Sequence, residues 1–301
     1  MVAAVTKPRT VCDPGVQRGA WWQPLRDDFD GPGFSPLGGL YYRDNFEQSA
    51  GTIEFQRDVR LTGAGALKLS VRPLAGADGS GHSERAEIWE RTDLWAPYGQ
   101  GMWYGFAVRF ADPIPEDNHR YLIAQWKREI LPGAEGDFSP FLALRMTNGK
   151  LYATVETNYV AASVEAATAG AVPTFLRPAM NQMRALVAVD DRWTAADAQL
   201  FSGASNALDI EDHGNPLPRP SSGWIEFTIF VKPGPDGSGR IEIIANGKPV
   251  VTVKGPIGHA DKGLGPRQYF KFGPYRAGHA GEWTLYYDHF RRSPDRRDVV
   301  G

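Results

Sequence analysis

The sequence predicts an all-β sandwich of two antiparallel sheets, and three observations lead to this fold class. Short runs of alternating apolar and polar residues, separated by Gly, Pro and Asn-Gly, extend along most of the 301-residue chain. No long segments with the helical period, which an α/β fold requires, interrupt them. Aromatic residues, which are common in strands, make up 12% of the chain. We therefore expect one β domain over residues 1–301.

The predicted strands follow one another at short intervals. In the first half of the chain they span residues 65–72, 84–90, 101–110, 120–129, 141–147 and 151–156. In the second half they span residues 224–232, 240–246, 248–253, 268–273 and 282–291. Asn148-Gly149 and Asn246-Gly247 each separate two such runs, and Asn-Gly is the strongest short-range signal for a hairpin.

A long insertion at about 158–222 breaks this rhythm. It begins with an Ala-rich segment, and we expect a short helix or two, including one that starts near Thr194 with Asp197 in its first turn. It ends in a Pro-rich loop at 215–220. Insertions of this length often form a wall or lid over a site, although a dispensable surface excursion is the alternative.

The composition excludes some classes of partner. The formal net charge of −2 gives no overall basic field for nucleic acid, although a local cluster of Arg and Lys can still hold a polyanion. No stretch approaches the roughly 18 apolar residues of a membrane helix. The N-terminal segment lacks the apolar region of a signal peptide. Cys12 is the one cysteine, so the redox compartment stays undetermined.

Three predicted strands carry an unusual set of polar and aromatic residues on one face, because residues two apart on a strand point the same way. These sets are Arg85, Glu87 and Trp89; Tyr121, Ile123, Gln125, Lys127 and Glu129; and Tyr269, Lys271 and Tyr275. Phe270 and Phe272 alternate with the last set and are expected in the core. An ordinary solvated face is the alternative, but such faces favour Lys, Glu and Thr over this mixture. We expect the three strands to line a groove.

The residue types in this groove suit β-elimination from a uronic acid. Removal of the proton at C5 requires donors that neutralise the carboxylate, a base, and an acid for the leaving oxygen. Arg85 offers a planar fork to a carboxylate, and Gln125 can donate to it. Tyr275, beside cations, can accept or donate a proton.

Three segments resemble the shared motifs of the jelly-roll polysaccharide lyases, a group that includes alginate lyases, glucuronan lyases and the heparin-lyase group. The segments are Ser-Glu-Arg-Ala-Glu-Ile at 83–88, Ile-Ala-Gln-Trp-Lys at 123–127 and Tyr-Phe-Lys-Phe-Gly-Pro-Tyr at 269–275. The last is the most specific. Weaker similarities at 101–106 and 285–290 extend the resemblance over about 65–292. The resemblance implies a concanavalin-like β-jelly-roll.

The resemblance also implies roles for individual residues. Arg85 and Gln125 would neutralise the substrate carboxylate, and Tyr275 would be the catalytic acid and in one alternative also the base. Lys271 would bind the glycan. Three further residues are expected to contact substrate: Glu87, Trp89 and Tyr269.

The base is open, because Lys127 stands where alginate lyases usually have a His. Tyr275 could act alone by syn elimination, Lys127 could be the base, or a His could come from elsewhere. His82, on a Gly-rich loop before Arg85, is the first candidate for that His, and His213 in the insertion is the second.

Other chemistries are less favoured. The resemblance implies no required cofactor, but a structural calcium is possible in such folds, and Asp30 and Asp288 are candidate ligands together with Asp27 and Asp28. A glycoside hydrolase needs two opposed carboxylates, for which Glu87 and Glu129 are the candidates. A non-catalytic glycan-binding module is the third alternative.

The resulting expectation is a polysaccharide lyase. Its substrate would be an acidic polysaccharide: glucuronan first, mannuronate-containing alginate second, a sulfated glycosaminoglycan third. We expect a monomer without nucleic-acid or membrane partners. The resemblance implies a secreted or periplasmic protein.

Overall fold

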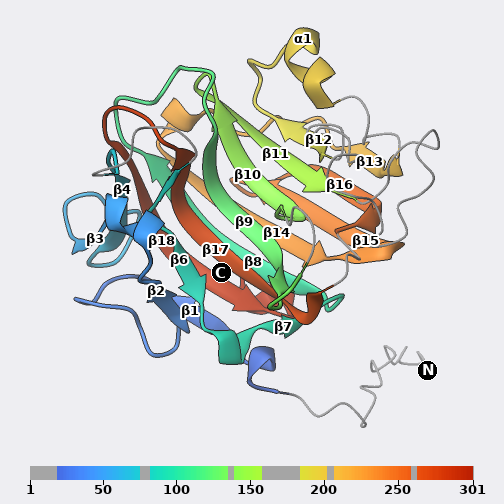
Figure 1. Cartoon of the computed structure of the whole chain (residues 1–301), viewed down its shortest axis with the longest axis horizontal. Helices are drawn as coiled ribbons and strands as arrows, with labels where there is room; N and C mark the ends of the chain where they lie inside the picture. Colours follow the sequence, from blue (N-terminus) through green and yellow to red (C-terminus); the bar gives the residue numbers. More distant parts are fainter. Residues whose placement is uncertain are drawn as a thin grey trace, which may run out of the picture.

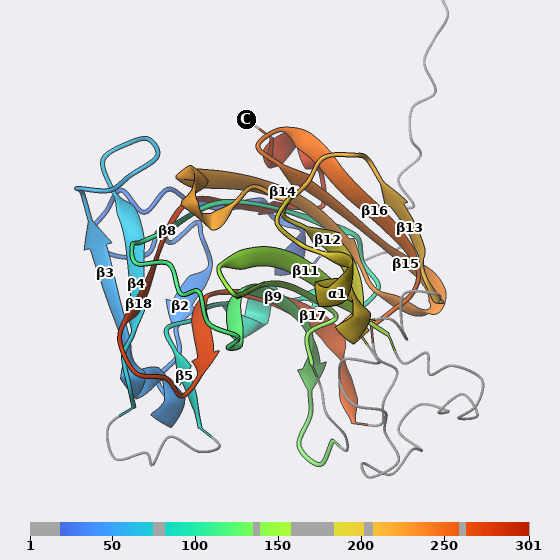
Figure 2. The same ribbon diagram turned by 90° about the horizontal axis from the view of Figure 1, so that it is seen from above.

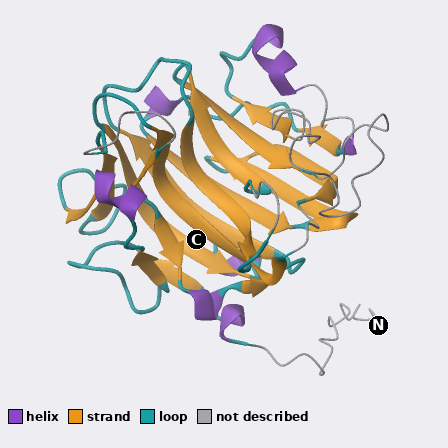
Figure 3. Ribbon diagram, in the orientation of Figure 1, coloured by secondary structure: helices purple, strands orange, loops and turns teal. Residues whose placement is uncertain are grey.

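Two antiparallel β-sheets packed face to face form most of the structure (Figure 1). It is a computed structural model that describes residues 19–74, 82–134, 139–157, 184–201, 207–258 and 263–300. Helical turns lie at the periphery of the strands (Figure 3). Figure 2 shows both sheets curving in the same sense, so that the free face of one sheet is concave. We call the two sheets the convex and the concave sheet.

The convex sheet lies over the other sheet in Figure 2. Its strand order is β13 (Asp209–Asp212), β16 (Lys248–Ile257), β15 (Gly234–Ala245), β14 (Trp224–Lys232), β8 (Met102–Phe110), β18 (Trp283–Ser293), β4 (Ala66–Val71) and β3 (Gly51–Gln56). The short β1 (Leu25–Asp27) also pairs with β18.

The concave sheet places residues from distant parts of the chain side by side. Its strand order is β12 (Arg184–Val189), β11 (Lys150–Glu156), β10 (Leu142–Thr147), β9 (Tyr121–Ile130), β17 (Leu264–Ala277), β6 (Ile88–Glu90) and β2 (Leu40–Tyr42). Two more short strands, β5 (Ser83–Arg85) and β7 (Ala96–Pro97), pair with β17. All three predicted groove strands therefore meet along β17.

The helices in the described part are short. They are α1 (Ala195–Ala198) and the 3₁₀ helices η1 (Ala20–Trp22), η2 (Phe46–Ala50), η3 (Thr92–Leu94), η6 (Gln199–Phe201), η8 (Pro220–Ser222) and η9 (Arg296–Asp298). Within the described residues, no helix has the length and apolar character needed to cross a membrane.

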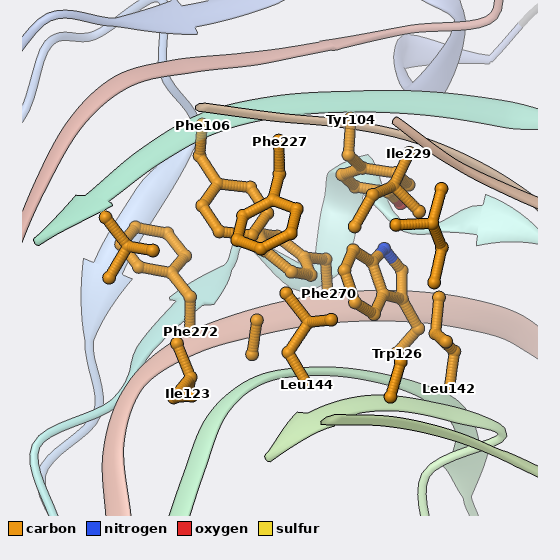
Figure 4. Close-up of a cluster of buried hydrophobic side chains, with 14 of the residues drawn as sticks. Tyr104, Phe106, Ile123, Trp126, Leu142, Leu144, Phe227, Ile229, Phe270 and Phe272 are labelled. Atoms are coloured by element: carbon orange, nitrogen blue, oxygen red, sulfur yellow. The ribbon is translucent and has the colours of Figure 1, made fainter. Parts of the chain in front are cut away.

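Aromatic rings from both sheets form the centre of the core (Figure 4). Phe270 of β17 lies 4.6 Å from Trp126 of β9 and 5.0 Å from Tyr104 of β8, measured between ring centroids. Phe272 is also buried, at 1% exposure. The predicted core positions of Phe270 and Phe272 are confirmed, and their burial forces the alternating residues of β17 onto the concave face.

The predicted strands and hairpins are largely confirmed. Asn148-Gly149 joins β10 to β11, and Asn246-Gly247 joins β15 to β16. All four turn residues have positive φ, as a type I′ turn requires. The prediction of one strand at 84–90 is wrong, because β5 and β6 are separated at Ala86 and Glu87.

A β-bulge in β9 makes one part of the facing prediction wrong. The pairing of β9 with β10 shifts register between Ala124 and Leu122, which leaves Ile123 as an extra residue. Tyr121 and Ile123 consequently belong to the core, with 0% exposure each. Gln125, after the bulge, stays on the concave face as predicted.

The stretch at about 158–222 adds to both sheets in its described part. β12 forms an edge of the concave sheet and β13 an edge of the convex sheet, and neither strand was predicted. The predicted helix is confirmed as α1, whose N-terminus has a reciprocal capping box between Thr194 and Asp197. The Ala-rich segment at 161–171 lies outside the described residues.

Phe270→Ala should lower the free energy of unfolding by about 3–5 kcal/mol, because it leaves a cavity among rings that cannot close over it. Denaturant unfolding followed by tryptophan fluorescence measures the change. Leu37→Ala is the control, since Leu37 is 58% exposed and should change stability by less than about 0.5 kcal/mol. Equal effects of the two substitutions would contradict this description of the core.

Candidate active site

A buried carboxylate organises the centre of the concave face. Glu87 is 1% exposed, and its Oε2 accepts hydrogen bonds from Lys271 Nζ at 2.8 Å and from Arg85 Nη1 at 3.1 Å. Its Oε1 accepts a hydrogen bond from Gln125 Nε2. One carboxylate therefore holds three of the predicted site residues, which come from β5, β9 and β17.

The charges in this cluster change its protonation equilibria. Burial by itself raises the pKa of Glu87, but Lys271 and Arg85 outweigh it, so the pKa of Glu87 is lowered and the carboxylate stays ionised. Burial lowers the pKa of Lys271 to about 7, opposed by Glu87 and assisted by the charges of Lys127 and Arg85. The pKa of Lys271 therefore lies near neutral pH.

The backbone around Glu87 is fixed by a side chain from η2. Gln48 is 3% exposed and pairs with Glu87 as a neighbouring strand would: Oε1 accepts from the Glu87 N–H at 3.0 Å, and Nε2 donates to the Glu87 carbonyl at 3.0 Å. On the other side Gly273 has φ +126°, and a Cβ there would collide with the carbonyl oxygen of Ala86. Glycine at 273 permits this close approach of β17.

Tyr275 lies next to this cluster, among cationic side chains. The pairing of β17 with β9 shifts register between Phe272 and Tyr275, opposite the bulge in β9, and this shift sets the position of Tyr275. The Arg85 guanidinium is 3.9 Å from the centre of the Tyr275 ring. Ser83 Oγ donates to the Tyr275 hydroxyl at 3.3 Å.

A hollow of about 180 Å³ opens beside Tyr275. It is lined by Arg85, Arg120, Leu122, Gln125, Lys127, Ser139, Pro140, Arg145, Arg184 and Tyr275. Five of these residues are cationic, and among the described lining residues none is a carboxylate. Such a hollow can bind an anionic group beside a tyrosine hydroxyl.

Three cationic lining residues were not predicted: Arg120, Arg145 and Arg184. Arg145 gave a signal in the sequence, because it is a single charge within the apolar run Leu-Ala-Leu-Arg-Met of β10. Arg184 begins β12, so it could not be placed before the pairing of that strand was known. Arg120 precedes β9, and no sequence pattern distinguishes it from a surface Arg.

Trp89 and Tyr269 pack against the side chain of Lys271 and against each other. The Tyr269 ring is stacked between Trp89 at 5.4 Å and Trp95 at 4.4 Å, and it is 5% exposed. Lys271 Nζ lies 4.3 Å from the centre of the Trp89 ring, and Trp89 is 7% exposed. With their faces covered in this way, both rings position Lys271 and do not offer an open platform for a sugar.

The predicted histidines lie apart from the hollow. His82 packs its ring against Phe46 at 5.7 Å, and it is not part of the described lining beside Tyr275. His213 contacts Thr252 Oγ1 at 2.9 Å on the edge of the convex sheet. His119, in the loop before β9, lines a second hollow next to the first.

The predicted calcium ligands bind backbone amides of one loop. Asp30 Oδ1 accepts from the N–H groups of Ala64 and Gly65, and Asp288 Oδ2 accepts from that of Leu61 at 3.0 Å. Among the described residues, no group of three or more His, Cys, Asp or Glu side chains is placed to hold a metal ion. Backbone N–H groups thus provide partners for both carboxylates, and the calcium site stays a prediction.

Comparisons with known proteins place this chain in a family. A family model described as polysaccharide lyase matches residues 35–291. No curated protein matches the chain.

Among solved structures, an endo-β-1,4-glucuronan lyase from the fungus Trichoderma reesei has a TM-score of 0.58 at 18% identity, over 92% of this chain and 97% of that chain. A cellulose-induced protein has a TM-score of 0.49 at 13% identity, over 90% and 97%. A family 7 alginate lyase solved with its product has a TM-score of 0.46 at 13% identity, over 91% and 95%.

The likeness to the glucuronan lyase shows that the two chains share a fold, and the predicted jelly-roll is confirmed. Because the family model covers most of the sequence, from residue 35 to residue 291, the chain belongs to the polysaccharide lyases.

Proposed function

We propose that this polysaccharide lyase cleaves a glucuronate-containing polysaccharide by β-elimination. The observation that carries the proposal is the hollow beside Tyr275, where five cations and Gln125 surround a tyrosine and the described lining contains no carboxylate. Glu87 and Glu156 pair with Arg85 and Arg184 from outside the lining, and a uronate carboxylate would bring a further negative charge into the hollow itself.

Each residue has a role in this scheme. Arg85 and the second N–H of the Gln125 amide hold the substrate carboxylate, while Glu87 fixes both side chains in place. Neutralising that carboxylate stabilises the carbanion that forms when the C5 proton leaves. Tyr275, as the phenolate, takes this proton and passes it to the glycosidic oxygen as the C4–O bond breaks, which leaves a C4=C5 double bond and regenerates the phenolate.

The assignment of the base to Tyr275 rests on the lining of the hollow. In the described lining, Lys127 is the one amine beside Tyr275, and no histidine lies there. Lys127 therefore remains the alternative base.

The contacts of the acidic residues favour elimination over hydrolysis. Glu87 is held by Lys271 and Arg85, and Glu129 pairs with Arg267 at 2.5 Å. A hydrolase needs one free carboxyl group to act as an acid and another to act as a nucleophile or base. Neither Glu87 nor Glu129 is placed for these roles.

Glucuronan is the first choice of substrate, mannuronate-containing alginate the second and a sulfated glycosaminoglycan the third. The glucuronan lyase named above supports the fold and leaves the substrate open, since the identity is 18%. The test is a panel of these polymers, scored for the ultraviolet absorbance of an unsaturated product. Reducing ends without this absorbance would indicate a hydrolase, and binding without either product a glycan-binding module. A polymeric substrate also agrees with a protein that acts outside the cell or in the periplasm.

Tyr275→Phe should lower kcat by about 10²–10⁴-fold, because the hydroxyl that transfers the proton is lost, while the Kd for the polymer stays close to that of the wild type. Initial rates of unsaturated product and calorimetric titration measure the two quantities. Tyr286→Phe, on β18 of the convex sheet, is the matched control and should keep full activity. Near-normal kcat in Tyr275→Phe, combined with a large loss in Lys127→Met, would assign the base to Lys127 instead.

The KM for the acidic polymer should rise as the pH increases through about 7. Lys271 loses its proton there, whereas Glu87, with its lowered pKa, stays charged, so the site becomes less positive and binds a polyanion less well. Rates at constant ionic strength over a pH series measure this. Lys271→Arg keeps the charge and should remove the rise; a rise of the same size in Lys271→Arg would show that another group causes it.

A further inference from the structure

Arg145 is a buried guanidinium that no described carboxylate contacts directly; the buried Glu156, which attracts it from further away, pairs with Arg184 instead. It lies in the middle of β10 and is 3% exposed. Its Nε donates to Thr154 Oγ1 at 2.9 Å, and within the described residues it forms no salt bridge. The other fully buried cations of the described residues each pair with a buried glutamate: Lys271 with Glu87, Arg276 with Glu84 and Arg292 with Glu90.

Such an arrangement is unfavourable in the unliganded protein. A buried charge without a counter-charge costs several kcal/mol unless it is paired. Burial, together with the neighbouring charge of Arg184, lowers the pKa of Arg145 to about 10, and the attraction of Glu156 offsets only part of this cost. A bound anion would remove the cost, so the arrangement favours ligand binding at this position.

Arg145 lies where two hollows meet. The hollow beside Tyr275 and a second hollow of about 520 Å³ are both lined by Arg120, Arg145 and Arg184. The one carboxylate in the described lining of the second hollow, Asp197, already binds Lys150 at 2.8 Å. The second hollow therefore also faces the three arginines with an excess of positive charge.

The second hollow has an aromatic wall. Trp193 lies 4.9 Å from Tyr152 and 6.2 Å from Phe201 between ring centroids, and all three line the hollow. The indole N–H of Trp193 is buried and has no acceptor within the described residues. Rings beside arginines, with an unused N–H donor, suit an acidic sugar, whose ring has an apolar face and polar hydroxyls.

We propose that Arg145, with Arg120 and Arg184, binds the carboxylate of a second uronate in the same polysaccharide chain, and that the hollow walled by Tyr152, Trp193 and Phe201 receives that sugar. The proposal rests on the proposed function, because it places this sugar next to the one that is cleaved. The lyase then prefers runs of consecutive uronates over polymers in which uronates alternate with neutral sugars.

Arg145→Gln tests the site directly. Loss of a charge-assisted contact should raise the KM for glucuronan by about tenfold to a hundredfold, with a smaller effect on kcat than on KM. Arg109→Gln is the matched control, since it removes the same charge from the exposed face of β8 in the convex sheet. Equal KM values for Arg145→Gln and the wild type would overturn the proposal.

A stability measurement separates binding from structural support. Because Arg145 forms no salt bridge within the described residues and Glu156 pairs with Arg184, Arg145→Met should unfold at the same or a higher temperature than the wild type. Weaker binding in a protein that is at least as stable supports a ligand-binding role. A lower unfolding temperature with unchanged KM would show that Arg145 only supports the sheet.

The preference for consecutive uronates is measured with two polymers. The wild type should cleave glucuronan with a higher kcat/KM than an alternating polymer of glucuronate and N-acetylglucosamine, and Arg145→Gln should reduce this ratio by lowering only the glucuronan value. An unchanged ratio would overturn the second-uronate site alone. Absence of unsaturated product from every uronate polymer would instead overturn the proposed function.

Discussion

The buried carboxylate of Glu87 is the interaction on which the rest of the site depends. It accepts hydrogen bonds from Lys271, Arg85 and Gln125, and these donors come from three strands of the concave sheet. An unpaired carboxylate at 1% exposure would be strongly destabilising, so the three donors must be in place for the sheet to form. The same contacts that stabilise the fold thus set the orientation of the groups that would meet a substrate.

Much of the concave face could be predicted from the sequence. Alternation around Phe270 and Phe272 assigns Lys271 to the face opposite the core, and the same rule brings Arg85 and Glu87 together. The rule failed at Ile123, because a bulge adds one residue and reverses the facing of all residues before it. A bulge results from pairing with a neighbouring strand, and one sequence does not show which strands are neighbours.

The arginines of the hollow show a second reason why sequence patterns predict only part of the site. Arg145 is a single charged residue within an apolar run, and this departure from the strand pattern could have marked it as a candidate functional residue. Arg184 and Arg120, in contrast, lie at the beginnings of strands, where charged residues are ordinary. Only the order β12-β11-β10-β9 brings them to one place. A cluster that arises from sheet order is invisible to motif comparison, which detects residues close together in the chain.

The pairing of Lys271 with Glu87 joins residues 184 positions apart in the chain. During synthesis, the strands that carry Arg85 and Gln125 leave the ribosome long before β17 has been made. Until then, the edge of β9 that β17 will cover is unpaired, and Glu87 lacks its ammonium partner. Long-range pairing of this kind is slow and leaves strand edges open to association with other chains. The site that would bind an acidic polymer therefore cannot be completed before β17 has been made, and a chain that ends before Lys271 would leave the edge of β9 open.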